Sequence, residues 1–226
     1  MRIKAITPIC VTDAELARRT ARYRELAPTG IEIDVVNLSD GDDVPRRLDR
    51  ADGITASDRL VAAEARRTDP ARHDAVLPDC VLDPGVLTAG DDAPVPVYGI
   101  LRLAAGFLAS LGQRFAAVTR NAPIGDELVA CLERYGLAER FDGLAVLDLT
   151  FDDIEDDATW NAAIDRVRDR FTDRGVQTVI NGCSAVEVRP RDGGATVVDP
   201  TQLALRLLGV AAASGLGGRM RAALLP

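Results

Sequence analysis

The sequence predicts an α/β fold of two pseudo-symmetric lobes, each a parallel sheet flanked by helices, with a cleft between the lobes. Segments typical of strands alternate with segments typical of helices along the 226 residues, and this alternation indicates βαβ units and parallel sheets. The same order of elements restarts near residue 114. A cysteine follows the third expected strand of each half, Cys80 in the first and Cys183 in the second.

The first half contains three expected strands and two expected helices. Thr12 and Asp13 are residue types that cap helix N-termini, and Pro28-Thr29-Gly30 is typical of a helix end. Ser57 or Thr55 is the expected cap of a second helix. The expected elements are a strand at 2–7, a helix from 12 or 13 to about 27, a strand at 31–38, a helix at about 56–67 and a strand at 74–79.

The second half repeats this order and adds a strand and a helix. Pro123 suits the first turn of a helix, and Gly136 and Gly175 suit helix ends. The expected elements are a strand at 114–119, a helix from about 123 to 135, a strand at 143–149, a helix at 157–174, strands at 176–181 and 195–198, and a terminal helix from 200 to about 213.

The boundary between the lobes is expected where Gly, Asp and Pro cluster, at residues 90–96. The first α/β lobe is therefore predicted at residues 1–96 and the second at residues 97–199, with 97–111 as the bridge between them. The C-terminal helix, within 200–226, is expected to pack back on the first lobe, so that the chain crosses between the lobes twice.

The composition excludes several classes of function. Hydrophobic residues make up 47% of the chain, enough for a core, and the net charge of -8 argues against nucleic-acid binding, which needs a basic surface. No apolar stretch reaches the ~20 residues that a membrane span needs, and the N-terminus does not resemble a signal peptide. We expect a cytoplasmic protein with no membrane partner, whose four cysteines are thiols.

The two strand-end cysteines suggest acid/base chemistry. Ligands of open parallel sheets bind outside the carboxyl ends of the strands, where Cys80 and Cys183 are both expected. If the lobes face each other, one thiolate can remove the proton α to a carbonyl and the other thiol can return a proton to the opposite face. A nearby cation or helix N-terminus would lower the pKa of a thiol, and main-chain N–H groups after each cysteine could stabilise an enolate.

These motifs resemble those of a known family. Cys80-Val81-Leu82-Asp83-Pro84-Gly85 looks like the first cysteine motif of hydantoin racemases, and Gly182-Cys183-Ser184 looks like the second. Residues 97–100, 117–119 and 197–199 also fall in the order and spacing of that family. The chain therefore resembles the aspartate/glutamate/hydantoin racemase superfamily over nearly its whole length, and is closest to the hydantoin racemase branch.

The resemblance implies a cofactor-independent isomerase with no metal. It implies that Cys80 and Cys183 are the catalytic acid/base pair, that the substrate is a small molecule, and that the protein is a homo-oligomer. It also implies a set of substrate-binding residues: the hydroxyl of Thr119, and the main chain beside each cysteine, at Val81, Gly182 and Ser184. Pro8, which matches the proline of the family's opening Asn-Pro-Asn, and Asn121, beside Arg120 after the strand at 114–119, complete the expected binding residues.

Departures from the family pattern bear on the substrate. Thr7-Pro8-Ile9 stands where family members have Asn-Pro-Asn, so two polar side chains are lost or shortened. Val81-Leu82 stands where the amino-acid racemases have Asn-Thr, which argues against aspartate or glutamate as the substrate. The predicted reaction is racemisation or epimerisation at a carbon α to a carbonyl in a hydantoin-like or related small molecule. The alternatives are an isomerase or decarboxylase that acts on a diacid or natural-product intermediate, and a non-catalytic two-lobed binding protein.

Three further residues have less specific interpretations. Cys10 follows the first strand and could reach the cleft, although a loop thiol without a role is the simpler interpretation. Cys131 lies in a helix with Leu128 and Leu132 nearby, which favours core packing. His73 precedes the strand that leads to Cys80, and is therefore expected at the opposite end of the sheet.

Overall fold

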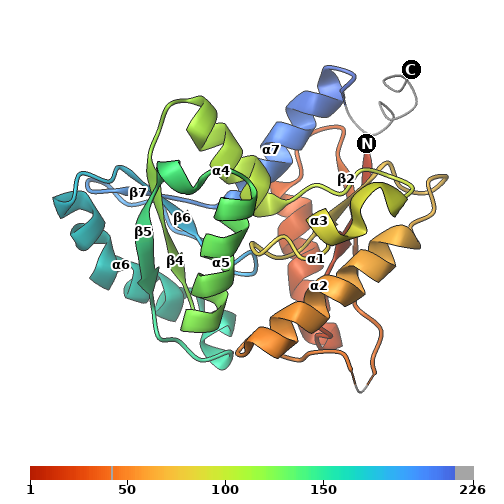
Figure 1. The fold of residues 1–226 in the computed structure, drawn as a ribbon, viewed down its shortest axis with the longest axis horizontal. Helices are drawn as coiled ribbons and strands as arrows, with labels where there is room; N and C mark the ends of the chain where they lie inside the picture. Colours follow the sequence, from red (N-terminus) through yellow and green to blue (C-terminus); the bar gives the residue numbers. More distant parts are fainter. Residues whose placement is uncertain (42, 217–226) are drawn as a thin grey trace.

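Two parallel sheets organise the protein, whose computed structural model describes residues 1–41 and 43–216 (Figure 1). The first sheet has the order β2-β1-β3 and the second the order β5-β4-β6-β7. In both sheets the first strand in sequence lies between the second and the third, so the halves share one topology and the predicted α/β fold is confirmed. The strands are β1 (Arg2–Ile6), β2 (Glu32–Val36), β3 (Ala75–Pro78), β4 (Phe115–Thr119), β5 (Phe141–Val146), β6 (Thr178–Asn181) and β7 (Thr196–Val198).

Five of the long helices agree with the predicted order, but the segment 97–111, predicted only as a bridge between the lobes, contains a further helix, α4 (Ile100–Ser110). Thr12 caps the first of them, as expected, and its hydroxyl accepts a hydrogen bond from the Glu15 amide at 3.2 Å. The long helices are α1 (Asp13–Leu26), α2 (Ala51–Arg66), α4 (Ile100–Ser110), α5 (Ala122–Arg134), α6 (Asp157–Asp173) and α7 (Pro200–Ala213). The short ones are α3 (Val86–Ala89) and the 3-10 turns Gly90–Asp92, Ala138–Arg140 and Asp152–Glu155.

The predicted start of α2 was wrong. The helix begins at Ala51, five residues before the expected position, and Arg50 is its N-cap residue without a side-chain cap. Thr55 and Ser57 therefore lie inside the helix. Their hydroxyls do not cap the helix N-terminus. The Thr55 hydroxyl donates to the Ala51 carbonyl at 3.0 Å, and the Ser57 hydroxyl donates to the Pro8 carbonyl at 2.5 Å.

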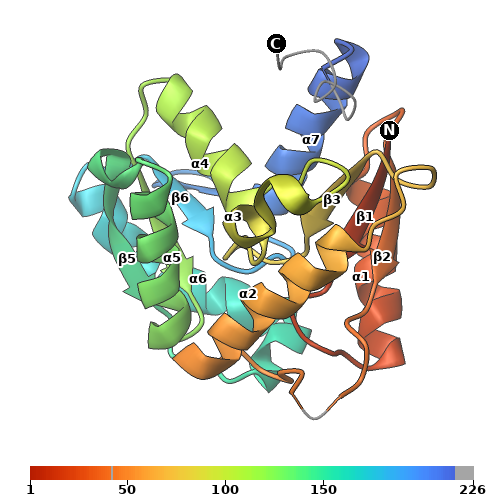
Figure 2. The ribbon, with the colours of Figure 1, turned by 45° about the vertical axis from the view of Figure 1, so that its right-hand side comes forward.

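Helices cover both faces of each sheet. Alternate residues of β4 face opposite sides: Phe115 and Ala117 pack in one cluster with α4 and α5, and Ala116 and Val118 pack in another with α6. In the first sheet, α2 packs against one face and α1 and α7 against the other. Figures 1 and 2 show that α2, from the first half of the chain, reaches toward α5 of the second half.

The C-terminal helix packs on elements of the first half. Ala204, Leu205 and Leu208 of α7 share a buried cluster with Ile3 and Ala5 of β1. The same helix lies against α4, as Figure 1 shows. The exact limits of the two lobes stay a prediction, and residues 217–226 of the predicted terminal segment lie outside the described residues. None of the helices in the described part of the chain is long and apolar enough to cross a membrane.

Candidate active site

Cys80 and Cys183 occupy equivalent positions in the two sheets. Each is the second residue after a strand, Cys80 after β3 and Cys183 after β6. Both side chains line one cavity of about 60 Å³, called here the two-cysteine cavity. Its walls come from residues of both halves of the chain: Pro8, Ile9, Arg19, Leu48, Asp79, Cys80, Val81, Leu82, Arg120, Ile124, Phe151, Ile154, Gly182, Cys183, Ser184 and Ala185.

The structure brings most of the predicted site residues together, but not all. Pro8, Val81, Gly182 and Ser184 line the cavity with the two cysteines. Thr119 and Asn121 do not line it. The Thr119 side chain is fully buried, and its hydroxyl donates to the Asn121 carbonyl at 3.3 Å. Asn121 caps α5 by accepting a hydrogen bond from the Ile124 amide at 2.9 Å. The Asn121 side-chain amide also donates to the Asp49 carboxylate at 3.0 Å, so both side chains have structural partners.

A direct hydrogen bond joins the two cysteine loops. The Ser184 hydroxyl, next to Cys183, donates to the main-chain carbonyl of Asp79, next to Cys80, at 3.0 Å. Gly182 lies on the other side of Cys183, and its amide donates to the Val118 carbonyl at 2.8 Å. A Cβ atom at this position would lie 2.1 Å from the Val118 carbonyl oxygen, so the close approach requires glycine.

Three arginines of α1 hold these loops. Arg19 is buried and donates to the Asp79 carboxylate at 2.6 Å. Arg18 donates to the Ala185 carbonyl at 2.8 Å, and Arg22 donates to the Ser184 carbonyl at 3.1 Å. Helix α1, which follows β1, therefore holds the Cys183 loop, which follows β6. The spacing of these arginines over five residues was visible in the sequence, but their partners lie up to 167 residues away, and no local pattern shows them.

A second buried guanidinium enters the cavity from β4. Arg120 follows the strand directly, pairs with Asp49, and stacks on the ring of Phe151 with 5.8 Å between its Cζ atom and the ring centroid. Arg19 and Arg120 therefore both line the two-cysteine cavity, and each is less than a tenth exposed.

The two thiols have different electrostatic surroundings. Burial raises the pKa of both. Around Cys183, the Ala185 amide and the guanidinium groups of Arg19 and Arg120 oppose this rise, while Asp79 adds to it. Around Cys80 only the Leu82 amide opposes it, while neighbouring carboxylates raise its pKa further. Cys183 is therefore the more easily ionised thiol of the pair.

The Asp83-Pro84-Gly85 turn fixes the loop after Cys80. Asp83 has a left-handed backbone with φ of 51°, and its carboxylate accepts hydrogen bonds from the amides of Leu101 and Arg102 at 2.9 and 2.8 Å and from the Tyr135 hydroxyl at 3.0 Å. Burial raises the pKa of Asp83 to about 7. The turn thus connects the Cys80 loop to the first turn of α4 and to the end of α5.

Gly85 also has a steric role in this turn. Its φ is 77°, and a Cβ there would lie 2.7 Å from the Ala62 amide nitrogen of α2. The turn thereby packs tightly on α2, which accounts for a glycine in the motif.

The other sequence-selected residues lie away from the two-cysteine cavity. Cys10 is buried but is not among the residues that line it. Cys131 is buried in a hydrophobic cluster with Leu128 and Leu132, as predicted, and it also lines a neighbouring cavity. His73 lies at the opposite end of the first sheet, as expected, with Nε2 3.3 Å from an Asp34 carboxylate oxygen.

Comparisons with known proteins give a consistent result. A family model described as Asp/Glu/hydantoin racemase matches residues 11–208. Allantoin racemase from Klebsiella pneumoniae has a similar structure, with 22% identity, a TM-score of 0.78, and coverage of 98% of this chain and 91% of that chain. For allantoin racemase from Pseudomonas fluorescens the identity is 20%, the TM-score 0.81, and the coverage 100% and 97%.

A more distant structure has the same fold. An aspartate racemase homologue from Pyrococcus horikoshii is 15% identical with a TM-score of 0.61, and the similarity covers 94% of this chain and 99% of that chain. At these identities, the structural likeness establishes the fold alone. No sequence among the curated proteins matches this chain.

Proposed function

This chain belongs to the Asp/Glu/hydantoin racemase family, and we propose that it inverts a carbon α to a carbonyl in a hydantoin-like small molecule, with Cys80 and Cys183 as the acid/base pair. Membership makes it an enzyme of the racemase type that acts on a small molecule. The observation that carries the proposal is one cavity lined by two thiols, one from the end of each sheet. An inversion needs a proton acceptor on one face of the carbon and a proton donor on the other.

The surroundings of the two thiols favour a different first role for each. Burial raises the pKa of both, but Arg19 and Arg120 oppose this rise at Cys183, so in the proposed reaction Cys183 acts first as the thiolate and Cys80 as the thiol. The Cys183 sulfur takes the α-proton, and the electron pair of the broken C–H bond moves onto the carbonyl as an enolate. The Cys80 thiol then gives its proton to the opposite face of the carbon. The reverse substrate enantiomer reacts with the roles exchanged.

The enolate develops negative charge next to two cations. Arg19 and Arg120 are buried and held by carboxylate partners, Asp79 and Asp49, so they need little rearrangement when charge appears. Fixed charges of this kind stabilise a transition state more than solvent does. The same cations oppose the rise that burial causes in the pKa of Cys183, and one pair of residues therefore serves both proton removal and enolate stabilisation.

Two features favour a hydantoin-like substrate over an amino acid. Two of the most similar structures are those of allantoin racemases. The loop after Cys80 presents Val81 and Leu82 to the cavity, two apolar side chains that offer nothing to an ammonium or a free carboxylate. A neutral imide-type ring is compatible with such walls.

The two guanidinium groups also favour an alternative. Arginine is well suited to bind carboxylates, and Arg19 and Arg120 both line the cavity. An isomerase or decarboxylase acting on a diacid or natural-product intermediate is therefore the second candidate. Release of CO₂ from a malonate, or isomerisation without α-proton exchange, would identify this alternative. A non-catalytic binding protein would instead show no turnover and two ordinary, unreactive thiols.

The proposal is tested by proton NMR of single enantiomers in D₂O, across 5-substituted hydantoins, allantoin, aspartate and glutamate. We expect exchange of the α-proton together with loss of optical rotation for the hydantoins. Cys80→Ala and Cys183→Ala should each slow racemisation by about 100-fold or more, since a positioned acid or base contributes roughly that factor. Cys10→Ala is the matched control, because Cys10 is buried but does not line the cavity. Racemisation at the normal rate in either active-site variant would exclude the cysteine pair.

A further inference from the structure

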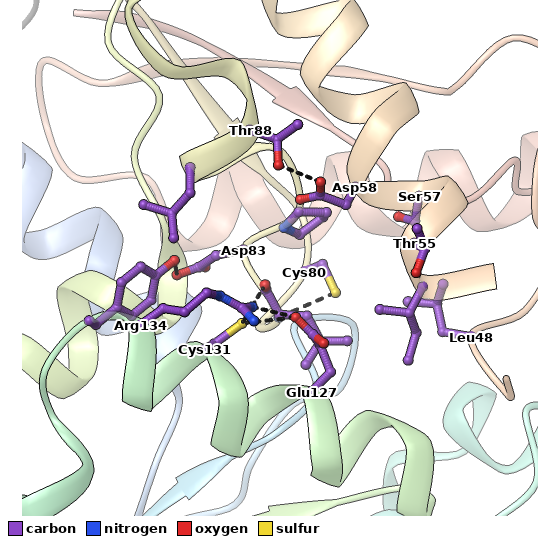
Figure 3. Close-up of a pocket in the computed structure, with 15 residues that line it drawn as sticks. Leu48, Thr55, Ser57, Asp58, Cys80, Asp83, Thr88, Glu127, Cys131 and Arg134 are labelled. Carbon is purple, nitrogen blue, oxygen red and sulfur yellow. Dashed lines mark hydrogen bonds and ion pairs between the residues drawn. The ribbon is translucent and has the colours of Figure 1, made fainter. Parts of the chain in front are cut away.

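A second cavity, of about 320 Å³, adjoins the two-cysteine cavity. The two share the side chains of Leu48, Cys80 and Leu82, so a molecule held between the thiols has this space beside it. Figure 3 shows residues of α2, α5 and the Cys80 loop around it. It is called here the adjoining cavity.

The two-cysteine cavity is too small for a substituted ring. Its volume of about 60 Å³ has room for about five water-sized atoms, at ~10–15 Å³ for each. The reacting carbon and its nearest atoms fit there. The rest of the substrate has to enter a neighbouring space, and the adjoining cavity offers a volume of about 320 Å³ next to Cys80.

The polar wall of the adjoining cavity is rich in hydrogen-bond acceptors. Asp58 of α2 accepts hydrogen bonds from the Gly85 amide at 2.7 Å and from the Thr88 hydroxyl at 2.5 Å. Glu127 of α5 forms an ion pair with Arg134. With Asp83, three carboxyl groups and one guanidinium line the space. A carboxylate placed there would meet more like charge than opposite charge.

We propose that the adjoining cavity is a subsite for the substituent on the inverted carbon, and that it selects an uncharged or cationic substituent bearing N–H donors over an anionic one. This inference rests on the proposed racemisation and adds a substrate class to it. A ureido, amide or amino group would donate to the carboxylates, while Leu48, Ile54 and Leu87 contact the apolar part of the substituent. An anionic substituent would be repelled by the carboxylates of the adjoining cavity. This holds even if Arg19 and Arg120 bind an anionic group in the two-cysteine cavity.

The size of the subsite is tested by filling it. Thr55 is an exposed residue of α2 that lines the adjoining cavity but not the two-cysteine cavity. In Thr55→Trp, the ratio of kcat/KM for allantoin, which is 5-ureidohydantoin, to that for 5-methylhydantoin should fall by about tenfold, since the indole occupies the space of the larger substituent. Arg59→Trp is the matched control, because Arg59 is exposed on the same helix and lines neither cavity. An unchanged ratio in Thr55→Trp would overturn the subsite.

The charge selectivity is tested at α5. The wild-type protein should prefer 5-ureidohydantoin to 5-carboxymethylhydantoin by about tenfold or more, since like charges placed together are costly. Glu127→Gln removes one carboxylate and should reduce this preference several-fold. Glu133→Gln is the control, an exposed residue of the same helix that does not line the cavity. A wild-type preference for the carboxymethyl compound would exclude the proposed selectivity.

Saturation-transfer NMR of the three hydantoins separates this proposal from the racemisation itself, because it detects binding without turnover. One outcome is no α-proton exchange, but binding in the expected order that is lost in Thr55→Trp. It would contradict the proposed reaction and support the subsite. Normal α-proton exchange with equal binding of the three compounds would support the proposed reaction and contradict the proposed subsite. If no hydantoin binds, both proposals fail.

Discussion

Cys80 and Cys183 hold the same position relative to their strands, yet their neighbours differ in charge. Asp79 and Asp83 raise the pKa of Cys80 beyond the effect of burial, while Arg19 and Arg120 act against burial at Cys183. The cysteines could be predicted from the sequence, because a strand followed by a cysteine is a local pattern. The cations could not, because Arg19 reaches the site only through the packing of α1 on both loops.

At pH values below the pKa of Cys183, activity should rise with pH as the thiolate forms. Arg120→Met removes a cation that lowers this pKa, so the rising limb of the kcat/KM profile should move to higher pH, with a several-fold loss of rate at pH 8. Arg120→Lys should restore most of the limb, since it keeps the charge.

Arg47→Met is the matched control for that profile. Arg47 also stacks on Phe151, with 5.3 Å from its Cζ atom to the ring centroid, but it does not line the two-cysteine cavity. Its loss should leave the limb in place. A profile that does not move in Arg120→Met would show that Arg120 does not act on the titrating thiol.

At the scale of elements, the order of the strands and of five long helices could be predicted, but helix α4 and several element ends could not. The hydroxyls of Thr55 and Ser57 suggested a helix start, but inside α2 they bond to main-chain carbonyls instead. Strand β5 begins at Phe141, two residues before its predicted start, where Phe141 pairs with Phe115 of β4. These boundaries depend on partners from other elements, which sequence patterns do not contain.

The cap that Asp83 provides for α4 has a pH-dependent contribution to stability. Burial raises the pKa of Asp83 to about 7 in the folded protein, whereas the unfolded chain ionises near its ordinary value of about 4. The folded state therefore holds the proton more tightly. The stability associated with this proton is complete below about pH 4 and is lost as pH rises through about 7.

Asp83→Asn tests this contribution. The free energy of unfolding of the wild type should fall relative to that of the variant by up to a few kcal/mol between pH 4 and 7. Urea denaturation at several pH values measures it. Asp156→Asn, at the N-cap of α6, is the comparison. Hydrogen bonds with Thr159 lower the pKa of that exposed carboxyl. We therefore expect the stability difference between the wild type and Asp156→Asn to change with pH only below about pH 4. A flat difference for Asp83→Asn would contradict the raised pKa.

At the scale of the whole molecule, the two halves are held together at the site itself. The Ser184 hydroxyl bonds to the Asp79 carbonyl, and Arg18 and Arg22 of α1 bond to carbonyls of the Cys183 loop. The two-lobed arrangement could be predicted from the repeated element order. The bonds between the lobes could not, since they connect residues more than 100 positions apart.

Ser184→Ala tests whether the hydrogen bond between the two cysteine loops serves catalysis as well as stability. Loss of this buried hydrogen bond should lower the free energy of unfolding by ~1–2 kcal/mol and reduce the rate of α-proton exchange several-fold, because the two loops lose their direct connection. Thr178→Val is the control, since its hydroxyl bonds to Gln113 at 3.1 Å and lies at the far end of β6. It should cost similar stability without slowing exchange. Equal rates in the two variants would show that the connection has no role in catalysis.

The packing of α7 has a consequence for how the chain is made. Ala204, Leu205 and Leu208 complete a buried cluster whose other members include Ile3 and Ala5. A ribosome releases the residues of β1 well before those of α7, and domains commonly fold as units during synthesis. Here the half that is synthesised first lacks part of its core until the final helix has emerged. Burial of Ile3 and Ala5 in this cluster therefore has to wait until the second half of the chain has also been synthesised.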